Sequence, residues 1–294
     1  MFNNIAIIFI SIFFEAMPFL LLGALISAVI ESFISDDTLE KLIPKNKFLG
    51  SIVGIFLGFF LPCCDCGVIP VAKRLIKKGV PLNVAIPFML ASPIINPVVL
   101  LSTYYAFYKT NPSILWYRLI LGISIALIIG IIISIIFNKK EVILNNNEKD
   151  NNCHCNEHKK DKKIIHIFKH TAIDFYEVLK FLIIGAILAS LIQVLLPQNI
   201  LAVFNGNHIL SILALMIFAY LISLCSTSDS FVGKSLLTSF SQTSIIAYLL
   251  LGPMIDIKNT IVLLGNYKKS FVITLITLIF IFVFLSACLI EVLL

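Results

Sequence analysis

The chain has 294 residues, of which 59% are hydrophobic and only 13% are charged, with a formal net charge of +6 and a mean hydropathy of +1.03. A soluble domain carries about 25% charged residues, so this composition excludes an ordinary soluble protein. It predicts a helical membrane protein, because lipid leaves the backbone groups of an open sheet unsatisfied. The basic residues gather in one central loop and at the ends of apolar segments, which is typical of membrane topology and not of nucleic-acid binding.

A membrane-spanning helix needs roughly 20 mainly apolar residues, and about eight stretches of the sequence meet that requirement. In chain order they cover residues 13–33, 49–74, 82–108, 114–137, 175–196, 209–231, 244–265 and 271–293. We therefore expect an all-α, polytopic membrane protein with about eight transmembrane helices. Residues 1–13 have no basic segment and no convincing cleavage site, so the first helix is expected to stay as a membrane anchor.

An acidic residue, Glu15, lies near the start of the first segment. The residue that matches it in the second half, Glu177, closely follows the basic central loop and is expected at the membrane surface. By analogy we expect Glu15 near an interface, with residues 1–12 lying flat before the helix turns inward. The alternative is a Glu15 in the middle of the membrane, where an ionisable residue would have a functional role.

The second segment is interrupted by the motif Pro62-Cys63-Cys64-Asp65-Cys66-Gly67. Residues two apart do not share a helix face, so Cys64 and Cys66 converge only where the backbone unwinds, which proline and glycine permit. Thiolates select soft ions and other thiophilic species. We therefore predict a substrate-binding role for Cys63, Cys64, Asp65 and Cys66. The alternative is a group of small residues that lets helices pack closely.

The loop 138–170, which follows the fourth segment, carries eight lysines and is therefore predicted to be cytoplasmic. It contains the motif Cys153-His154-Cys155-Asn156-Glu157-His158. Short tracts rich in Cys and His are typical of metal binding, and imidazole together with thiolate suits zinc or copper. We predict that Cys153, His154, Cys155 and His158 could hold a soft metal ion. The alternative is a variable, flexible tract with incidental affinity.

The second half of the chain is similar to the first at a nearly constant offset. The offset is 162 between Glu15 and Glu177, 161 between Cys64 and Cys225, and 160 both between Pro93 and Pro253 and between Asn96 and Asp256. We therefore predict two membrane repeats, residues 1–137 and 171–294, joined by the loop 138–170. Each repeat has an intact helix, a helix broken at a cysteine motif, a helix broken near a proline and a second intact helix.

The breaks of both repeats carry polar residues at matching positions. The second repeat has Cys225-Ser226-Thr227-Ser228-Asp229 and, at its proline break, Gly252-Pro253-Met254-Ile255-Asp256. Interrupted apolar segments at matching positions of two halves point to a transporter binding site near the membrane midplane. We therefore add further substrate-binding residues, namely Pro93, Asn96, Cys225, Ser226, Thr227, Ser228, Asp229 and Asp256. Asp65 or Asp229 could exchange protons, whereas Asp256 could instead sit near Lys258 at a surface.

The distribution of charge predicts the orientation of the segments. The loop 138–170 is basic, the connection 197–208 has no Lys or Arg, and the second segment ends in a basic cluster of Lys73, Arg74, Lys77 and Lys78. Four crossings per repeat satisfy these constraints, place both termini in the cytoplasm and make the repeats parallel. Lys268 and Lys269 would then lie outside, against the rule. If a break is instead a re-entrant pair, the number of segments becomes ten, or the repeats become inverted.

Several of these motifs together resemble those of a known family. They are Leu61-Pro62-Cys63-Cys64-Asp65-Cys66-Gly67-Val68-Ile69-Pro70-Val71, Gly79-Val80-Pro81, Ala91-Ser92-Pro93-Ile94-Ile95-Asn96-Pro97-Val98-Val99 and Ser223-Leu224-Cys225-Ser226-Thr227-Ser228-Asp229. From about Glu15 to Gly265 the chain resembles the predicted-permease family that contains the ArsP-type organoarsenical efflux permeases. The resemblance implies a bacterial cytoplasmic-membrane permease, export of trivalent methylated or aromatic arsenicals by some members, and thiol roles for Cys64, Cys66 and Cys225. One departure is Asp65, where the family usually has serine.

These features predict a secondary transporter that moves a small thiophilic solute through a midplane Cys/Asp site, with organoarsenical efflux as one such activity. The expected partners are a small-molecule or metalloid substrate and the lipid bilayer, and no nucleic acid. We expect no enzyme activity, because the sequence has no Walker-type loop, dinucleotide fingerprint or nucleophile elbow. No cofactor is required, although the central loop could hold a soft metal ion. The alternatives are one subunit of a two-component permease complex, with a membrane partner, and a membrane thiol-redox protein in which Cys63, Cys64 and Cys66 change oxidation state.

Overall fold

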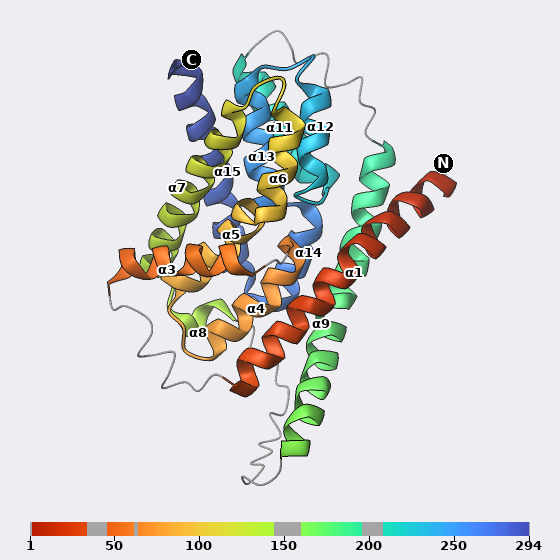
Figure 1. Cartoon of the computed structure of the whole chain (residues 1–294), viewed down its shortest axis with the longest axis vertical. Coiled ribbons are helices and arrows are strands. Elements are labelled where there is room, and N and C mark those ends of the chain that lie inside the picture. The colour runs from red at the N-terminus through yellow and green to blue at the C-terminus, as the bar shows by residue number, and fades with distance from the viewer. Residues whose placement is uncertain (1, 34–45, 62–63, 144–159, 196–207, 294) are drawn as a thin grey trace.

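A computed structural model describes residues 2–33, 46–61, 64–143, 160–195 and 208–293 (Figure 1). In these ranges every regular element is a helix, and one isolated bridge joins Ile143 to Tyr267. The helices are α1 (Phe2–Phe33), α3 (Lys47–Phe60), α4 (Asp65–Lys77), α5 (Leu82–Ile95), α6 (Pro97–Phe107), α7 (Ser113–Ile136), α8 (Lys139–Val142), α9 (Lys160–Leu195), α11 (His208–Ile222), α12 (Ser228–Leu236), α13 (Gln242–Met254), α14 (Ile257–Asn266) and α15 (Lys269–Leu293). The predicted all-α class is confirmed.

Within the described ranges, six helical stretches are long and apolar enough to cross a membrane. They are Asn3–Ile30, Leu82–Phe107, Ser113–Ile136, Thr171–Leu195, Gln242–Asn266 and Lys269–Val292. Two shorter apolar helices, Lys47–Phe60 and His208–Ile222, occupy the positions of the second and sixth predicted segments. A polytopic helical membrane protein is therefore confirmed, whereas eight full-length transmembrane helices are not.

The second and sixth segments do not continue as single helices, because the chain turns back at each cysteine motif. The pairs α3 with α4 and α11 with α12 are called the two hairpins here, and their arms pack mainly on other helices such as α1, α5 and α13. At the start of α5, the Asn83 side chain donates a hydrogen bond to the carbonyl oxygen of Lys47 at the start of α3 (3.0 Å). Because α4 ends only a few residues before α5, both ends of the first hairpin lie at one end of the molecule. The second hairpin is similar, since the hydroxyl groups of Ser211 at the start of α11 and Ser244 at the start of α13 are 3.1 Å apart.

The two hairpins enter from opposite ends of the molecule. At one end Asn111, just after α6, donates a hydrogen bond to Gln242 at the start of α13 (3.2 Å). At the other end Lys73 of α4 donates to Asn266, the last residue of α14 (3.0 Å). Each half therefore contributes three of the six spanning stretches, and the two halves run in opposite directions. The parallel arrangement with four crossings per half is wrong, and the inverted alternative fits the structure. The predicted domain boundaries stay a prediction.

Both termini lie at the end of the molecule opposite the helices that flank the central loop. α1 runs antiparallel to α9, with Ser27 near its end donating to Asp174 near the start of α9 (3.0 Å). Glu291 near the end of α15 pairs with His208 at the start of α11 (2.9 Å). In Figure 1 the N and C labels are in the upper part of the picture, whereas α8 and the start of α9 are in the lower part. Three spanning stretches separate each terminus from the loop, so the structure places the termini and the loop at opposite ends of the molecule, and the cytoplasmic location of the termini stays a prediction.

Reporter fusions test this topology. We expect a reporter at the N-terminus and one at the C-terminus to lie on the same side of the membrane, and a reporter inserted within residues 144–159 to lie on the other side. The measurement compares a fluorescent protein, which matures in the cytoplasm, with alkaline phosphatase, which is active only outside it. Three reporters on one side would contradict three crossings per half.

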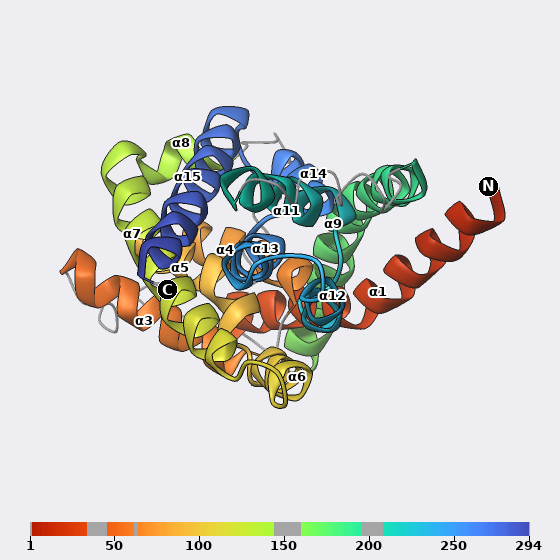
Figure 2. The ribbon, with the colours of Figure 1, turned by 90° about the horizontal axis from the view of Figure 1, so that it is seen from above.

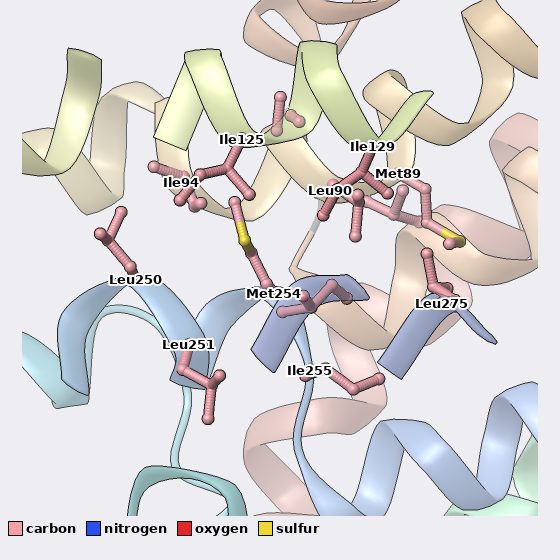
Figure 3. Packing of buried hydrophobic residues seen from close by; sticks show 14 of the residues in the cluster. Met89, Leu90, Ile94, Ile125, Ile129, Leu250, Leu251, Met254, Ile255 and Leu275 are labelled. Carbon is pink, nitrogen blue, oxygen red and sulfur yellow. The ribbon is translucent and has the colours of Figure 1, made fainter. Parts of the chain in front are cut away.

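The helices α5 and α13, each of which precedes a break, form the protein interior, whereas α6 lies at its edge. Side chains all around α5 and α13 are buried, as expected for helices that are apolar on every face. Figure 3 shows Ile94 of α5 packed with Ile125 of α7 and Met254 of α13. Seen from above, α5 and α13 lie near the centre while α1 and α9 lie to one side (Figure 2). α1, α9 and α15 expose large apolar side chains, which suits contact with lipid. The helix breaks at Asn96 and Asp256 therefore lie inside the protein.

Candidate functional site

The tip of the first hairpin places two thiols and one carboxylate side by side. Cys64 precedes α4 in an extended backbone conformation, and its carbonyl oxygen accepts the first helical hydrogen bonds, from Gly67 and Val68 (3.1 and 3.2 Å). The break before Asp65 frees Cys64 from the side-chain directions of the helix. The sulfur atoms of Cys64 and Cys66 and an oxygen of Asp65 lie within 4.8 Å of one another, and all three residues are buried. The predicted site residue Cys63 lies outside the described residues.

The start of α14 supplies a buried ammonium group to this tip. Lys258 Nζ lies 3.5 Å from Asp65 Oδ2 and 3.4 Å from Asp256 Oδ2, and the Lys258 side chain is only 4% exposed. Asn259 Nδ2 donates a hydrogen bond to Asp65 Oδ2 (2.7 Å). A buried charge is stable only with opposite charges and hydrogen bonds around it. Asp256 does lie beside Lys258, as the alternative expectation had it, but in the interior and not at a surface.

Cys64, Asp65, Cys66 and Lys258 line a pocket that both hairpins and α1 enclose. Its lining residues are Ile12, Glu15, Ala16, Cys64, Asp65, Cys66, Ser223, Leu224, Cys225 and Lys258. Glu15 lies near the middle of α1, so its expected position at a membrane interface is wrong. Its counterpart Glu177 instead pairs with Lys73 at the base of the first hairpin (3.2 Å).

The tip of the second hairpin contributes the third thiol. Ser223 has a positive φ of 52°, and its hydroxyl accepts a hydrogen bond from the Lys258 backbone N–H (3.4 Å). Cys225 lines the pocket, and Thr227 donates to its sulfur atom (3.7 Å). Ser228 donates to Glu15 on the pocket wall (3.4 Å). The structure therefore brings predicted residues from both cysteine motifs to one place.

A second buried polar cluster, formed by Arg118, Thr103, Ser230, Asp229 and Tyr248, lies between α6, α7, α12 and α13. Arg118 Nη1 donates hydrogen bonds to the Thr103 and Ser230 hydroxyls (2.6 and 2.9 Å). Tyr248 donates its hydroxyl hydrogen to Asp229 Oδ1 (3.1 Å). Arg118 also interacts electrostatically with Asp229 and is fully buried. This cluster, and not the pocket, contains the predicted residue Asp229.

The remaining residues that were predicted to bind substrate or metal lie outside the pocket or outside the described residues. Ser226 is buried and its carbonyl oxygen accepts a hydrogen bond from Arg118 Nη2 (3.4 Å). Pro93 is buried within α5, and Asn96 caps α6 by accepting a hydrogen bond from the Val98 backbone N–H (3.0 Å). Neither lines the pocket. The predicted metal ligands of the central loop, Cys153, His154, Cys155 and His158, lie outside the described residues.

Sequence reasoning missed Arg118, Asn259 and Tyr248, and it treated Lys258 only as a surface neighbour. For Arg118 the signal was present, because it is a single basic residue inside an apolar segment, and ionisable residues there usually have a function. Lys258 could have been found in the same way. Asn259 and Tyr248 gave no such signal, because their roles depend on groups from distant parts of the chain.

A family model described as predicted permease matches residues 1–292. The chain is 39% identical over 286 residues to the UPF0718 protein YcgR of Bacillus subtilis, which covers 97% of this chain and 96% of that protein. It is 38% identical over 267 residues to a Streptococcus mutans protein that is named as a candidate subunit of a two-component membrane permease complex, covering 90% and 88% of the two chains. No solved structure gives a significant match to the chain.

Proposed function

The chain belongs to the predicted permease family, and from this premise we propose that it is a secondary transporter whose small, thiophilic solute passes through the pocket between the hairpin tips. The observation that carries this proposal is the presence of three thiols, Cys64, Cys66 and Cys225, around one pocket to which both hairpins contribute. Thiolates bind soft, thiophilic species. Binding sites at the breaks of inverted repeats are typical of secondary transporters. In this proposal the chain carries solute and performs no enzymatic reaction.

The hairpins would act as the two gates of such a transporter. Each is held at its base while its tip meets the pocket. At the base of the first hairpin, Arg74 makes a two-point contact with Asp174 (3.1 and 2.8 Å). At the base of the second, Ser211 contacts Ser244. Because the bases lie at opposite ends of the molecule, a displacement of one tip would open the pocket to one side only, which is the requirement for alternating access.

Trivalent organoarsenicals are one cargo that the pocket could take. Arsenic(III) is thiophilic, and three thiols face the same space. The additional carboxylate of Asp65, however, has no obvious role toward a neutral arsenical.

The thiol of Cys64 provides the direct test. We expect Cys64→Ser to abolish transport without loss of membrane insertion, because serine keeps the size of the side chain but removes the soft ligand. The measurement is a resistance screen of a deletion strain against arsenicals, antimonials and soft metals, with complementation by the wild type or the variant. The matched control is Cys288→Ser, which changes a cysteine of α15 that does not line the pocket. Full transport by Cys64→Ser would remove the thiol from the mechanism.

A second arrangement, in which the chain is one subunit of a permease complex, has one supporting observation. The Streptococcus mutans relative is named as such a candidate subunit, and the match covers 90% of the present chain. Purification of the tagged chain from its native membrane under mild detergent tests this arrangement. A membrane protein that copurifies in equal amount, and whose deletion stops transport, would support it.

A further inference from the structure

The pocket has an excess of negative groups among its described residues. Carboxyl groups come from Glu15 and Asp65 on the pocket wall and from Asp256 directly behind it. The ammonium group of Lys258 is the positive group that faces them in this part of the chain. A site lined by one sign of charge attracts solutes of the opposite sign and repels solutes of the same sign. This balance favours a cation over an anion or a neutral molecule.

The carboxylate of Asp65 has one oxygen that the protein does not use. Oδ2 accepts a hydrogen bond from Asn259 and lies near Lys258. Oδ1 is buried and has no hydrogen-bond partner in the described part of the chain, although the residue is only 6% exposed and lines the pocket. Buried polar atoms are nearly always paired. One half of this carboxylate is therefore available to a solute that supplies a positive charge.

The donor atoms are also close enough to share one ion. The bond from zinc to a thiolate sulfur is about 2.3 Å long, and the bond from zinc to a carboxylate oxygen is about 2.1 Å long. Two donor atoms around one ion therefore lie at most about 4.6 Å apart. The Cys64 sulfur, the Cys66 sulfur and an Asp65 oxygen lie within 4.8 Å of one another, which requires only a small approach. Two sulfur donors with one oxygen donor select soft cations over hard ones.

From these three observations we propose that the solute of this pocket is a soft metal cation, bound by the thiolates of Cys64 and Cys66 and by Asp65, with Cys225 as a third thiol from the opposite hairpin. The inference rests on the proposed permease function and narrows its substrate class. When a divalent ion binds, two S–H bonds break, two metal–sulfur bonds form and two protons leave, with no transfer of electrons. Lys258 stays paired with Oδ2 of Asp65 and offsets part of the negative charge of that carboxylate. Cys225 would join the two hairpin tips through the ion.

Cadmium binding to the purified full-length protein tests the inference. The background variant carries Cys153→Ser and Cys155→Ser, because the thiols of the central loop would also bind the ion. We expect this protein to bind one Cd²⁺ per chain, with an ultraviolet sulfur-to-cadmium charge-transfer band and release of two protons to an indicator dye. Further Cys64→Ser and Cys66→Ser changes should abolish the band. Because loss of even an outer partner of a metal ligand weakens affinity about 10- to 100-fold, Asp65→Asn should weaken binding at least tenfold.

A neutral trivalent phenylarsenical separates the substrate classes. It needs thiols but no added negative charge, so Asp65→Asn should weaken its binding much less than that of Cd²⁺. The control Cys288→Ser should change neither. Absence of Cd²⁺ binding in the background variant, or equal affinity in Asp65→Asn, would overturn the inference. If transport still depended on Cys64 in that case, the proposed permease function would stand and only the cation would be excluded.

Discussion

A Gly23→Val variant should yield little or no correctly folded protein, because Gly23 is where α1 touches the backbone of the cysteine hairpin. A Cβ atom built at Gly23 would collide with the carbonyl oxygen of Gly67 and would lie 2.8 Å from its Cα atom. Gly67 follows Cys66 directly in α4. A collision with backbone cannot be relieved by rotating a side chain, so α1 and α4 would have to separate and the hairpin tip would move.

Overpacking of a tight interior costs about 1–3 kcal/mol, and a backbone contact belongs at the upper end of that range. The measurement is the yield of monodisperse protein in detergent and its thermal denaturation. Gly23→Ala is a more specific test. In an exposed helix, alanine would stabilise the protein by about 1 kcal/mol relative to glycine, whereas at this contact it should destabilise the protein. Leu22→Val, on an exposed side of the same helix, is the matched control. A stabilised Gly23→Ala variant would show that α1 and α4 do not pack this closely.

The corresponding glycine of the second half has a similar role. A Cβ atom at Gly185 would lie 3.1 Å from both the Cα and the carbonyl oxygen of Lys258, in the first turn of α14. Each of the two matched glycines thus lets one long helix approach a segment that carries pocket residues. Gly23 and Gly185 are separated by 162 positions, the same offset as Glu15 and Glu177, and close packing beside the pocket accounts for a glycine at both positions.

The sequence was sufficient to locate the breaks but not the path of the chain through them. Aspartate marks the breaks because ionisable residues inside a membrane are costly, and proline marks them because it removes a backbone hydrogen bond of the helix. An interrupted apolar segment has the same length and composition whether it spans as a kinked helix or returns as a hairpin. Contacts between distant residues, such as Asn83 with Lys47, decide between the two, and a single sequence gives no sign of them.

The sequence predicted the thiols of the site but not the positions of its charged residues. Cys64, Cys66 and Cys225 stand in recognisable motifs, and the structure brings them to one pocket. Glu15 was placed at an interface by analogy with Glu177, but α1 packs against the hairpin tip and α9 against its base, so matched positions have different surroundings. Lys258 was missed because a single lysine hardly changes the mean hydropathy of its segment, although its burial between two carboxylates dominates the local electrostatics.

An Arg118→Leu variant should be strongly destabilised, because the arginine is the positive group of a buried cluster. Its guanidinium group binds the Thr103 and Ser230 hydroxyls and the Ser226 carbonyl oxygen, which come from α6, α12 and the second hairpin tip. Leucine fills most of the volume but donates no hydrogen bond. It also leaves the buried carboxylate of Asp229 without the charge that offsets it. Removal of one partner from a buried charge pair costs roughly 3–5 kcal/mol.

Two further variants distinguish the lost charge from the lost hydrogen bonds, with the same yield and denaturation measurements. Arg118→Lys keeps the charge but lacks the planar fork that reaches several acceptors at once, so it should be intermediate in stability. Asp229→Asn added to Arg118→Leu removes the uncompensated carboxylate while its amide can still accept the Tyr248 hydrogen bond, so the double variant should recover part of the lost stability. If the double variant were less stable than Arg118→Leu, the two charges would not compensate each other. The cluster would then act through its hydrogen bonds alone, and Arg118→Lys should be as unstable as Arg118→Leu.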